Sequence, residues 1–525
     1  IFDAYWPGGT KNTAWWKNFV GLLTEVASTK MGTPVDVSVN ELSGGGKGLI
    51  DYVPQTNFPN PWPGGLWRLR DIMDYERIAS DALLENCATF RQDLLRAVAT
   101  MAQDAIASAP ADEYYVIPRR QRDPIAAARL AYLLHENGAE VCVSQDETAY
   151  VVPAAQPYAR FVSEFLNVQR YPRVRPTGGS GILSPYDVTA WSLPLMMAVD
   201  VQRRKLSAEE QMGVRALQES DKPAGSVDRA GAALYAVRPE SNATAKLVND
   251  VLKRKAGIVR VARTGFTDEG SSYPAGTIIL EGIQDAAGLA RAHAVAMTGL
   301  RQRPTVALDQ LTEPRIALYK PWQASMDEGW TRFVLDQYGF ASTAVDNKRI
   351  KDGKIGKDFN VLLIADITKD VIVEGKYKPE EGQMKYSAEL PPEYSGGITK
   401  EGVKNVREFV EQGGTLVALG RSSEFVMEEF NVPVANALAR VKAEEFNCPG
   451  TLLRIHLDSH HPVTFGMPET AAAFVTGKLA FQTTIPGSEM TRTVLAWYPA
   501  EREDILLSGW IQGEEKLERK AAAVA

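Results

Sequence analysis

The sequence is poor in the residues that carry most metal and redox chemistry. Its 525 residues include 3 cysteines and 5 histidines. The cysteines, Cys87, Cys142 and Cys448, are far apart and odd in number, so we expect buried thiols rather than a disulfide framework. The chain also lacks an apolar run of about 18 residues, the length that a membrane-spanning helix needs. We therefore expect no membrane span.

An excess of positive charge is absent as well. The formal net charge is −7 and the sequence pI is about 5.6. Because nucleic-acid-binding proteins usually carry a basic face, we expect no nucleic-acid partner. The composition is that of an ordinary globular chain, and its length predicts about three or four domains.

Residues 19–28 (FVGLLTEVAS) are a short apolar run bounded by turn-forming residues, and they contain one carboxylate, Glu25. Such a run predicts a strand that is buried on both faces. A glutamate there is costly unless it is paired, hydrogen-bonded or open to a cleft. The alternative is an edge strand with Glu25 in water.

Residues 66–108 contain neither glycine nor proline, and their apolar residues recur mostly every three or four positions. This spacing predicts one long amphipathic helix, or two helices that nearly abut. Pro110 follows and is expected to end the helix.

These stretches, with the Gly8-Gly9 turn and the loop Asn57-Phe-Pro-Asn-Pro-Trp-Pro-Gly-Gly65, resemble the C-terminal end of a zinc carboxypeptidase of the carboxypeptidase A type. The resemblance covers residues 1–110. It implies that Glu25 is the catalytic base, which takes a proton from a zinc-activated water and returns it to the leaving amine. It also implies that Tyr5 contacts a peptide or peptide-like substrate, and that the protein is secreted or periplasmic.

The zinc ligands of that family, a His-x-x-Glu pair and a distant histidine, are not found at matching positions. No histidine precedes Glu25, and none has the His-x-x-Glu spacing. We therefore expect a fragment whose zinc-binding half lies upstream, and we expect this chain alone to bind no catalytic zinc and to be inactive. The alternative hypothesis is a non-catalytic binding or scaffold protein.

Residues 111–312 contain two similar stretches, at about 113–157 and 232–282. Each predicts a strand, a helix, a glycine and two further strands, which indicates a duplicated α/β unit. Between them, residues 185–194 (PYDVTAWSLP) resemble a phrase in the extension of the same bacterial carboxypeptidase-like proteins. For this phrase we expect a packed aromatic corner between the two units.

Residues 313–525 alternate predicted strands and helices, which is typical of a doubly wound parallel sheet. The pattern is similar to the class I glutamine amidotransferase-like fold, in a form that we expect to be incomplete at its end. An active member of that fold has a cysteine at the turn where this chain has Gly420-Arg-Ser-Ser. This difference implies a degenerate domain.

Two other interpretations of this region remain open. Ser422 or Ser423 could act as a nucleophile if a histidine served as its base, and the candidate bases are His456, His460 and His461. The same three histidines could bind a metal ion from one face of a strand. We expect structural histidines instead.

Overall fold

The computed structural model describes residues 6–26, 32–43, 51–175, 181–376 and 394–525. Contacts divide the chain into two compact units. Of the described residues, 6–109 and 155–161 belong to the first unit and the others belong to the second. None of the described helices combines the length and the apolar character that crossing a membrane needs.

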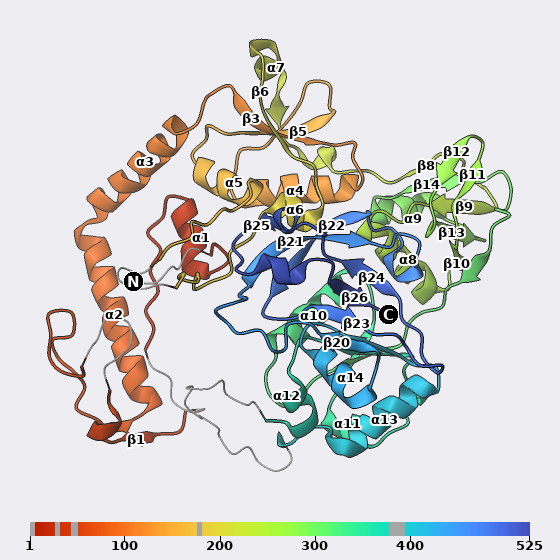
Figure 1. Ribbon diagram of the computed structural model, residues 1–525. Helices are drawn as coiled ribbons and strands as arrows, with labels where there is room; N and C mark the ends of the chain where they lie inside the picture. The colour runs from red at the N-terminus through yellow and green to blue at the C-terminus, as the bar shows by residue number, and fades with distance from the viewer. Residues whose placement is uncertain (1–5, 27–31, 44–50, 176–180, 377–393) are drawn as a thin grey trace. The chain divides into compact units, whose positions relative to one another are not determined.

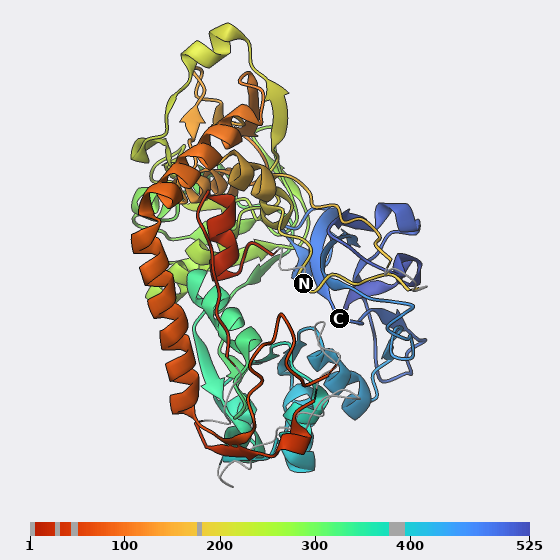
Figure 2. The same cartoon turned by 90° about the vertical axis from the view of Figure 1, so that its left-hand side faces the viewer.

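The first unit contains a long pair of helices. The predicted helical region forms α2 (Leu69–Thr89) and α3 (Arg91–Ala107), which meet at Phe90. Of the two predicted forms, one long helix or two that nearly abut, the second is present. Figure 2 shows them as a rod that changes direction near the junction. Shorter elements complete the described part of this unit: α1 (Thr10–Trp16), β1 (Val35–Val37), η1 (Val39–Glu41) and β2 (Gly65–Trp67), with β1 antiparallel to β2.

The buried strand expected around Glu25 is not present in residues 19–26, and that prediction is wrong for them. Val20 is 65% exposed, and Glu25 is exposed too. A strand is stable only when another strand satisfies its backbone donors and acceptors. In the described part of the chain, no strand pairs with this stretch.

The second unit begins with a five-stranded sheet in the order β6-β3-β5-β4-β7. Asp123 caps α4, since its Oδ1 accepts hydrogen bonds from the backbone N–H groups of Ile125 and Ala126 at 3.0 and 3.1 Å. Pro124 then occupies the first helical position, where its missing N–H costs nothing. The elements are β3 (Glu113–Pro118), α4 (Pro124–Glu136), β4 (Cys142–Val143), β5 (Ala149–Pro153), α5 (Ala159–Leu166), α6 (Leu193–Met197), β6 (Gln202–Lys205), α7 (Ala208–Gly213) and β7 (Arg215–Ala216). The first three residues of α5 belong to the first unit.

A second sheet follows with a similar centre, in the order β15-β10-β13-β9-β14-β8. Its strands β9, β13 and β10 are antiparallel neighbours in the same arrangement as β3, β5 and β4. The elements are β8 (Ser226–Val227), β9 (Leu234–Val237), α8 (Asn242–Arg254), β10 (Ile258–Ala262), β11 (Phe266–Asp268), β12 (Ser271–Tyr273), β13 (Ile278–Glu281), α9 (Ala286–His293), β14 (Ala296–Gly299) and β15 (Leu308–Gln310).

The two faces of this second sheet are covered differently. Tyr235 and Val237 share a core with α8 and α9, whereas Ala236, between them in the strand, packs with Tyr273 of β12. This alternation follows from the two-residue period of a strand. The helices therefore cover one face, and the β11–β12 hairpin lies on the other.

Residues 316–430 contain a four-stranded parallel sheet in the order β17-β16-β18-β19, as expected for a doubly wound domain. Figure 1 shows α11, α12, α13 and α14 in this part of the chain. The elements are β16 (Ile316–Tyr319), α10 (Met326–Gln337), β17 (Ser342–Val345), α11 (Asn347–Lys351), β18 (Val361–Ile364), α12 (Lys369–Glu374), α13 (Thr399–Glu411), β19 (Thr415–Ala418) and α14 (Ser422–Phe430).

Residues 434–525 do not continue that sheet, so the prediction of one doubly wound domain up to residue 525 is wrong. They form a separate sheet, β20-β23-β26-β24-β21-β22, with β25 paired to β21 and with antiparallel ladders throughout. Its strands are joined by turns and loops, whereas parallel neighbours require longer crossovers. The strands are β20 (Val434–Asn436), β21 (Pro449–Leu457), β22 (Thr470–Thr476), β23 (Phe481–Thr483), β24 (Val494–Trp497), β25 (Leu506–Ser508) and β26 (Ala521–Val524).

The corner expected at residues 185–194 packs against this last sheet rather than between the two similar units. Thr189 is 0% exposed, and its Oγ1 donates to the carbonyl of Gly450 at 2.8 Å. The backbone N–H of Trp510 donates to the same Oγ1 at 3.0 Å. Thr451 Oγ1 lies 3.1 Å from it. We call these four residues the Thr189 clasp.

Candidate functional site

The carboxyl ends of β16, β18 and β19 lie at one edge of the parallel sheet, where loops 320–325, 365–368 and 419–421 leave it. Ligands of open α/β sheets bind at this edge. Polar and aromatic side chains from the three loops and from the start of α10 are found here. We define the carboxyl-edge site by Trp322, Asp327, Asp366 and Arg421.

An ion pair joins the ends of β18 and β19. The Nε of Arg421 donates to Asp366 Oδ1 at 2.7 Å, and the backbone N–H of Arg421 donates to the same oxygen at 3.2 Å. Gly420 allows this approach: its φ is +56°, and a Cβ there would lie 2.8 Å from Asp366 Cγ. The turn after β19 therefore requires glycine, for both its conformation and its space.

Asp327 adds a second carboxylate from the first turn of α10. Burial raises the pKa of Asp327, the negative charge of Asp366 raises it further, and Arg421 acts in the opposite direction. Two carboxylates next to one guanidinium favour a positively charged partner, since each carboxylate gains from a nearby cation.

An aromatic side chain lies in loop 320–325, which leaves the same edge of the sheet after β16. Trp322 follows β16 and is 37% exposed. Its ring meets that of Tyr394 edge-on, with centroids 5.4 Å apart. Aromatic faces attract cations such as ammonium and guanidinium groups. The site can therefore attract a positive charge through both its carboxylates and its aromatic faces.

The serines proposed as nucleophiles are differently placed. Ser422 is 0% exposed, and its Oγ donates to the carbonyls of Leu419 and Ile364, at 2.8 and 3.1 Å. Ser423 Oγ lies 3.4 Å from the carbonyl of Ala418. In this arrangement both hydroxyls stabilise the turn into α14, and the side chain that reaches the carboxyl edge is that of Arg421.

The three late histidines make other contacts. His456 lies in β21, where its Nδ1 is 3.3 Å from Thr470 Oγ1. His461 caps a short turn, because its Nδ1 accepts from the backbone N–H of Val463 at 3.3 Å, and His460 lies 3.6 Å from Asp458. Across the described residues, no group of three or more His, Cys, Asp or Glu side chains is arranged to hold a metal ion. The residues that the structure describes therefore do not fit the zinc that the carboxypeptidase resemblance implies.

The carboxypeptidase candidates fall in the first unit. Glu25 lies in an exposed, irregular segment, and Tyr5 lies outside the described residues. The neighbouring Thr24 donates from its Oγ1 to Glu76 Oε2 on α2, so this segment contacts the long helix.

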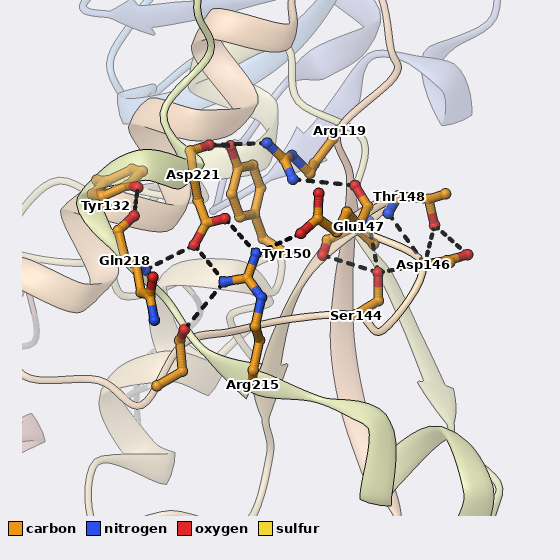
Figure 3. A network of polar contacts seen from close by, with 12 residues as sticks. Arg119, Tyr132, Ser144, Asp146, Glu147, Thr148, Tyr150, Arg215, Gln218 and Asp221 are labelled. Carbon is orange, nitrogen blue, oxygen red and sulfur yellow. Dashed lines mark hydrogen bonds and ion pairs between the residues drawn. The ribbon is translucent and has the colours of Figure 1, made fainter.

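A larger polar network lies in the first sheet of the second unit (Figure 3). Arg215 holds both carboxylate oxygens of Asp221, at 2.6 and 2.8 Å, and reaches Glu147 at 2.9 Å. The Asp221 side chain is only 5% exposed, and Arg215 lowers its pKa. Tyr150 donates to the Asp221 carbonyl at 2.9 Å, and Arg119 donates to the same carbonyl at 3.1 Å.

Each charged group of that network is matched by another group within it. Arg215 pairs with the carboxylates of Asp221 and Glu147, and Arg119 donates to the main-chain carbonyls of Glu147 and Asp221. The hydroxyl of Tyr132 is bonded to the Gln218 carbonyl. Burial raises the pKa of Tyr132 to about 12. A network closed in this way anchors loop 217–222 to the sheet, and we assign it a structural role.

Comparisons with known proteins give no family for this chain. No family model matches it, and no curated protein matches it. Among solved structures, a GMP synthase-like protein from Thermoplasma acidophilum is similar, with a TM-score of 0.23 and 9% identity over 36% of this chain and 75% of that one. A ThuA-like protein from Bacteroides uniformis has a TM-score of 0.22 and 14% identity over 38% of this chain and 78% of that one. The chain has a mixed α/β fold with several sheets, and this description is based on its own strand order.

The sequence analysis singled out the turn after β19 for its two serines, whereas the side chain of that turn that faces the carboxyl edge is Arg421. Asp366 directly follows the apolar run 361–365, and Arg421 adjoins the two proposed serines. The signal that would have found both is their position: each follows a strand of one parallel sheet, and such positions meet at one edge.

Proposed function

We propose that this chain is a non-catalytic binding protein, in which the amidotransferase-like residues 313–430 present the carboxyl-edge site to a ligand. The observation that carries the proposal is the burial of the Ser422 side chain. A nucleophile at this turn has to be exposed and activated by a neighbouring base. Ser422 is instead buried against two main-chain carbonyls.

The ligand that suits the site carries a positive charge. Asp327 and Asp366 supply two carboxylates against the single guanidinium of Arg421, and Trp322 adds an aromatic face. A peptide or peptide-like molecule with a lysine side chain or a free amino group has this chemistry.

The proposal is tested by measuring binding and hydrolysis on the full chain. We expect acetyl-lysine-amide to bind at least fivefold more tightly than acetyl-norleucine-amide, which has a similar shape without the charge. Asp366→Asn should reduce that preference, and Asp336→Asn, near the other end of α10, should leave it unchanged. We also expect no glutamine hydrolysis and no labelling of Ser422 or Ser423 by a fluorophosphonate. Labelling of either serine, or equal binding of the two amides, would overturn the proposal.

A second candidate is zinc-dependent carboxypeptidase activity with Glu25 as the base. The observation in its favour is that Glu25 is exposed in a segment that contacts α2 through Thr24 and Glu76. Because the described residues do not hold the metal, its ligands would have to come from elsewhere.

To test this candidate, zinc content and C-terminal cleavage are compared between this chain and a form that includes any coding sequence upstream of it. The candidate requires the longer form to hold zinc and to cleave. Glu25→Gln should then abolish cleavage while the zinc content stays the same. A longer form without zinc or cleavage removes this candidate.

A further inference from the structure

The β11–β12 hairpin has a regular turn that determines where its backbone groups point. Glu269 and Gly270 both have positive φ, 46° and 81°, as in a two-residue hairpin turn. The pair that flanks such a turn, Asp268 and Ser271, is hydrogen-bonded across the ladder. In the next pair, the N–H and C=O groups of Thr267 and Ser272 therefore point outward, away from the partner strand.

The outward backbone groups on the two edges of the hairpin differ in their hydrogen bonding. On the β12 edge, the outward carbonyl of Ser272 accepts a hydrogen bond from Arg238 Nη1 at 2.8 Å. On the β11 edge, the outward N–H and C=O groups of Thr267 have no hydrogen-bond partner among the described residues. An unpaired strand edge is a template for a further strand.

A cavity of about 250 Å³ adjoins β11. Residues 265–268 form one wall and residues 302–306 form the other, and no residue of β12 takes part. Figure 1 shows the hairpin on the green part of the ribbon. The open backbone groups of Thr267 thus belong to a wall of the cavity.

The walls are held in place before any ligand arrives. The ring of Phe266 stacks on that of Tyr273, with centroids 4.9 Å apart. At the tip, Glu269 pairs with Arg229 at 2.7 Å, and Asp268 Oδ2 accepts from the backbone N–H of Arg301 at 3.3 Å. A fixed wall lowers the entropy that binding costs.

We infer that this cavity binds an extended peptide segment of a partner protein, which adds as a strand to β11 and pairs its main chain with Thr267. A wall of four extended residues is about 13 Å long, at about 3.3 Å per residue. The cavity is smaller than the usual small-molecule pocket of about 300–1,000 Å³. It suits one strand that passes through it, with both ends outside.

The recognition is mainly through the peptide backbone. Arg303 of the second wall is already paired with Glu281 at 2.9 Å, and Asp268 of the first wall already accepts from the backbone N–H of Arg301. Both charged side chains of the walls therefore have partners within the chain. Main-chain hydrogen bonds then supply the affinity, as in other cases of strand addition. The inference does not depend on the carboxyl-edge site.

The test uses a random dodecapeptide library displayed on phage, selected on the full chain, and the tightest peptide is then synthesised. Thr267→Pro removes the outward N–H and leaves the hairpin ladder intact, because that N–H is not part of it. Thr267→Ala keeps the backbone donor and is the matched control. Thr305→Trp fills the cavity without changing β11. Circular dichroism and thermal unfolding confirm that each variant is folded.

We expect the peptide to bind at least tenfold more weakly to Thr267→Pro and to Thr305→Trp, and within twofold of the original affinity to Thr267→Ala. The amide of Thr267 should exchange rapidly in the free protein and slow at least tenfold when the peptide is bound. Three results would overturn the inference: a Thr267 amide already protected in the free protein, peptides that bind Thr267→Pro equally well, or a dimer of this chain that Thr267→Pro abolishes.

Discussion

Replacing Thr189 with valine removes the hydroxyl at the centre of the Thr189 clasp and keeps the side-chain volume. The backbone N–H of Trp510 then loses the acceptor that lies 3.0 Å away, in a fully buried place. The carbonyl of Gly450 keeps one donor, because the backbone N–H of Thr189 also reaches it at 2.8 Å. The damage is therefore concentrated on one orphaned donor.

The expected cost follows from these contacts. A buried donor without a partner costs about 1–3 kcal/mol, and the lost hydroxyl bond adds about 1 kcal/mol. We expect the last sheet to lose about 2–4 kcal/mol of local stability, which corresponds to a rise of about 30- to 900-fold in the opening equilibrium, at 1.36 kcal/mol for each factor of ten. Native-state hydrogen exchange of the amides in β21 measures this quantity directly.

The control is Thr189→Ser, which keeps the hydroxyl and loses one methyl group. Burial of a methyl-sized group is worth about 0.8 kcal/mol, so this variant should change exchange by less than about tenfold. If serine and valine accelerate exchange equally, the hydrogen bonds of the clasp do not stabilise the sheet and the argument fails. If neither variant changes exchange, residues 185–194 do not anchor the sheet at all.

Two further changes test other parts of the second unit. Asp221→Asn should lower the free energy of unfolding by about 1–2 kcal/mol, a modest loss because water partly screens the charge of Arg215. Arg215 lowers the pKa of Asp221, so the stability that this ion pair adds is present above pH ~4 and is lost as the pH falls through the depressed pKa. Urea unfolding between pH 2 and pH 7 should therefore show a smaller pH dependence in Asp221→Asn than in Glu219→Gln, whose side chain is 81% exposed; equal pH dependence would contradict the argument. Gly509→Ala should accelerate exchange in β21 more than Thr189→Val, since the glycine has φ +102° and a Cβ there would lie 2.6 Å from Thr189 Oγ1; a smaller effect would show that the segment can move aside.

The elements that sequence reasoning identified correctly are those whose signals lie within one or two turns of chain. The helix predicted within residues 113–157 is α4, which begins at Pro124 directly after its cap Asp123, because a cap and a proline act on their immediate neighbours. The same holds for the α2 and α3 pair, whose apolar spacing is a local property. The parallel strands were found for a related reason, since short apolar runs between helices are typical of buried parallel sheets.

The wrong predictions concern strands whose pairing partners cannot be identified from the local sequence. Residues 19–26 have the composition of a strand, but a strand also needs a neighbour for its backbone, and the described chain offers none. In residues 434–525 the antiparallel pairing of the strands, such as that of β25 (Leu506–Ser508) with β21, could not be predicted from the local sequence. Propensity indicates where a strand lies, whereas the connections decide what it pairs with.

The candidate site shows the same limit at the level of side chains. The sequence located the turn after β19, but it could not tell which of three adjacent polar residues faces the open edge. Gly420 settles this, because its left-handed φ turns Arg421 toward Asp366 and places Ser422 against the carbonyls of the strands.

In the Thr189 clasp, Thr189 contacts Gly450 and Thr451, which lie 261 and 262 positions further along the chain. No short sequence motif predicts a contact between residues so far apart. The clasp nevertheless predicts how the chain can be divided. Residues 313–525 expressed alone lack Thr189, and they also lack Gln169, whose backbone N–H is bonded to Ser508 Oγ at 2.8 Å. Buried polar groups that lose their partners cost more than the bonds themselves contribute. We therefore expect that piece to expose or unfold its last sheet, seen as rapid exchange in β21, and residues 110–525 to retain slow exchange there. Slow exchange in the shorter piece would show that the last sheet is stable without the clasp.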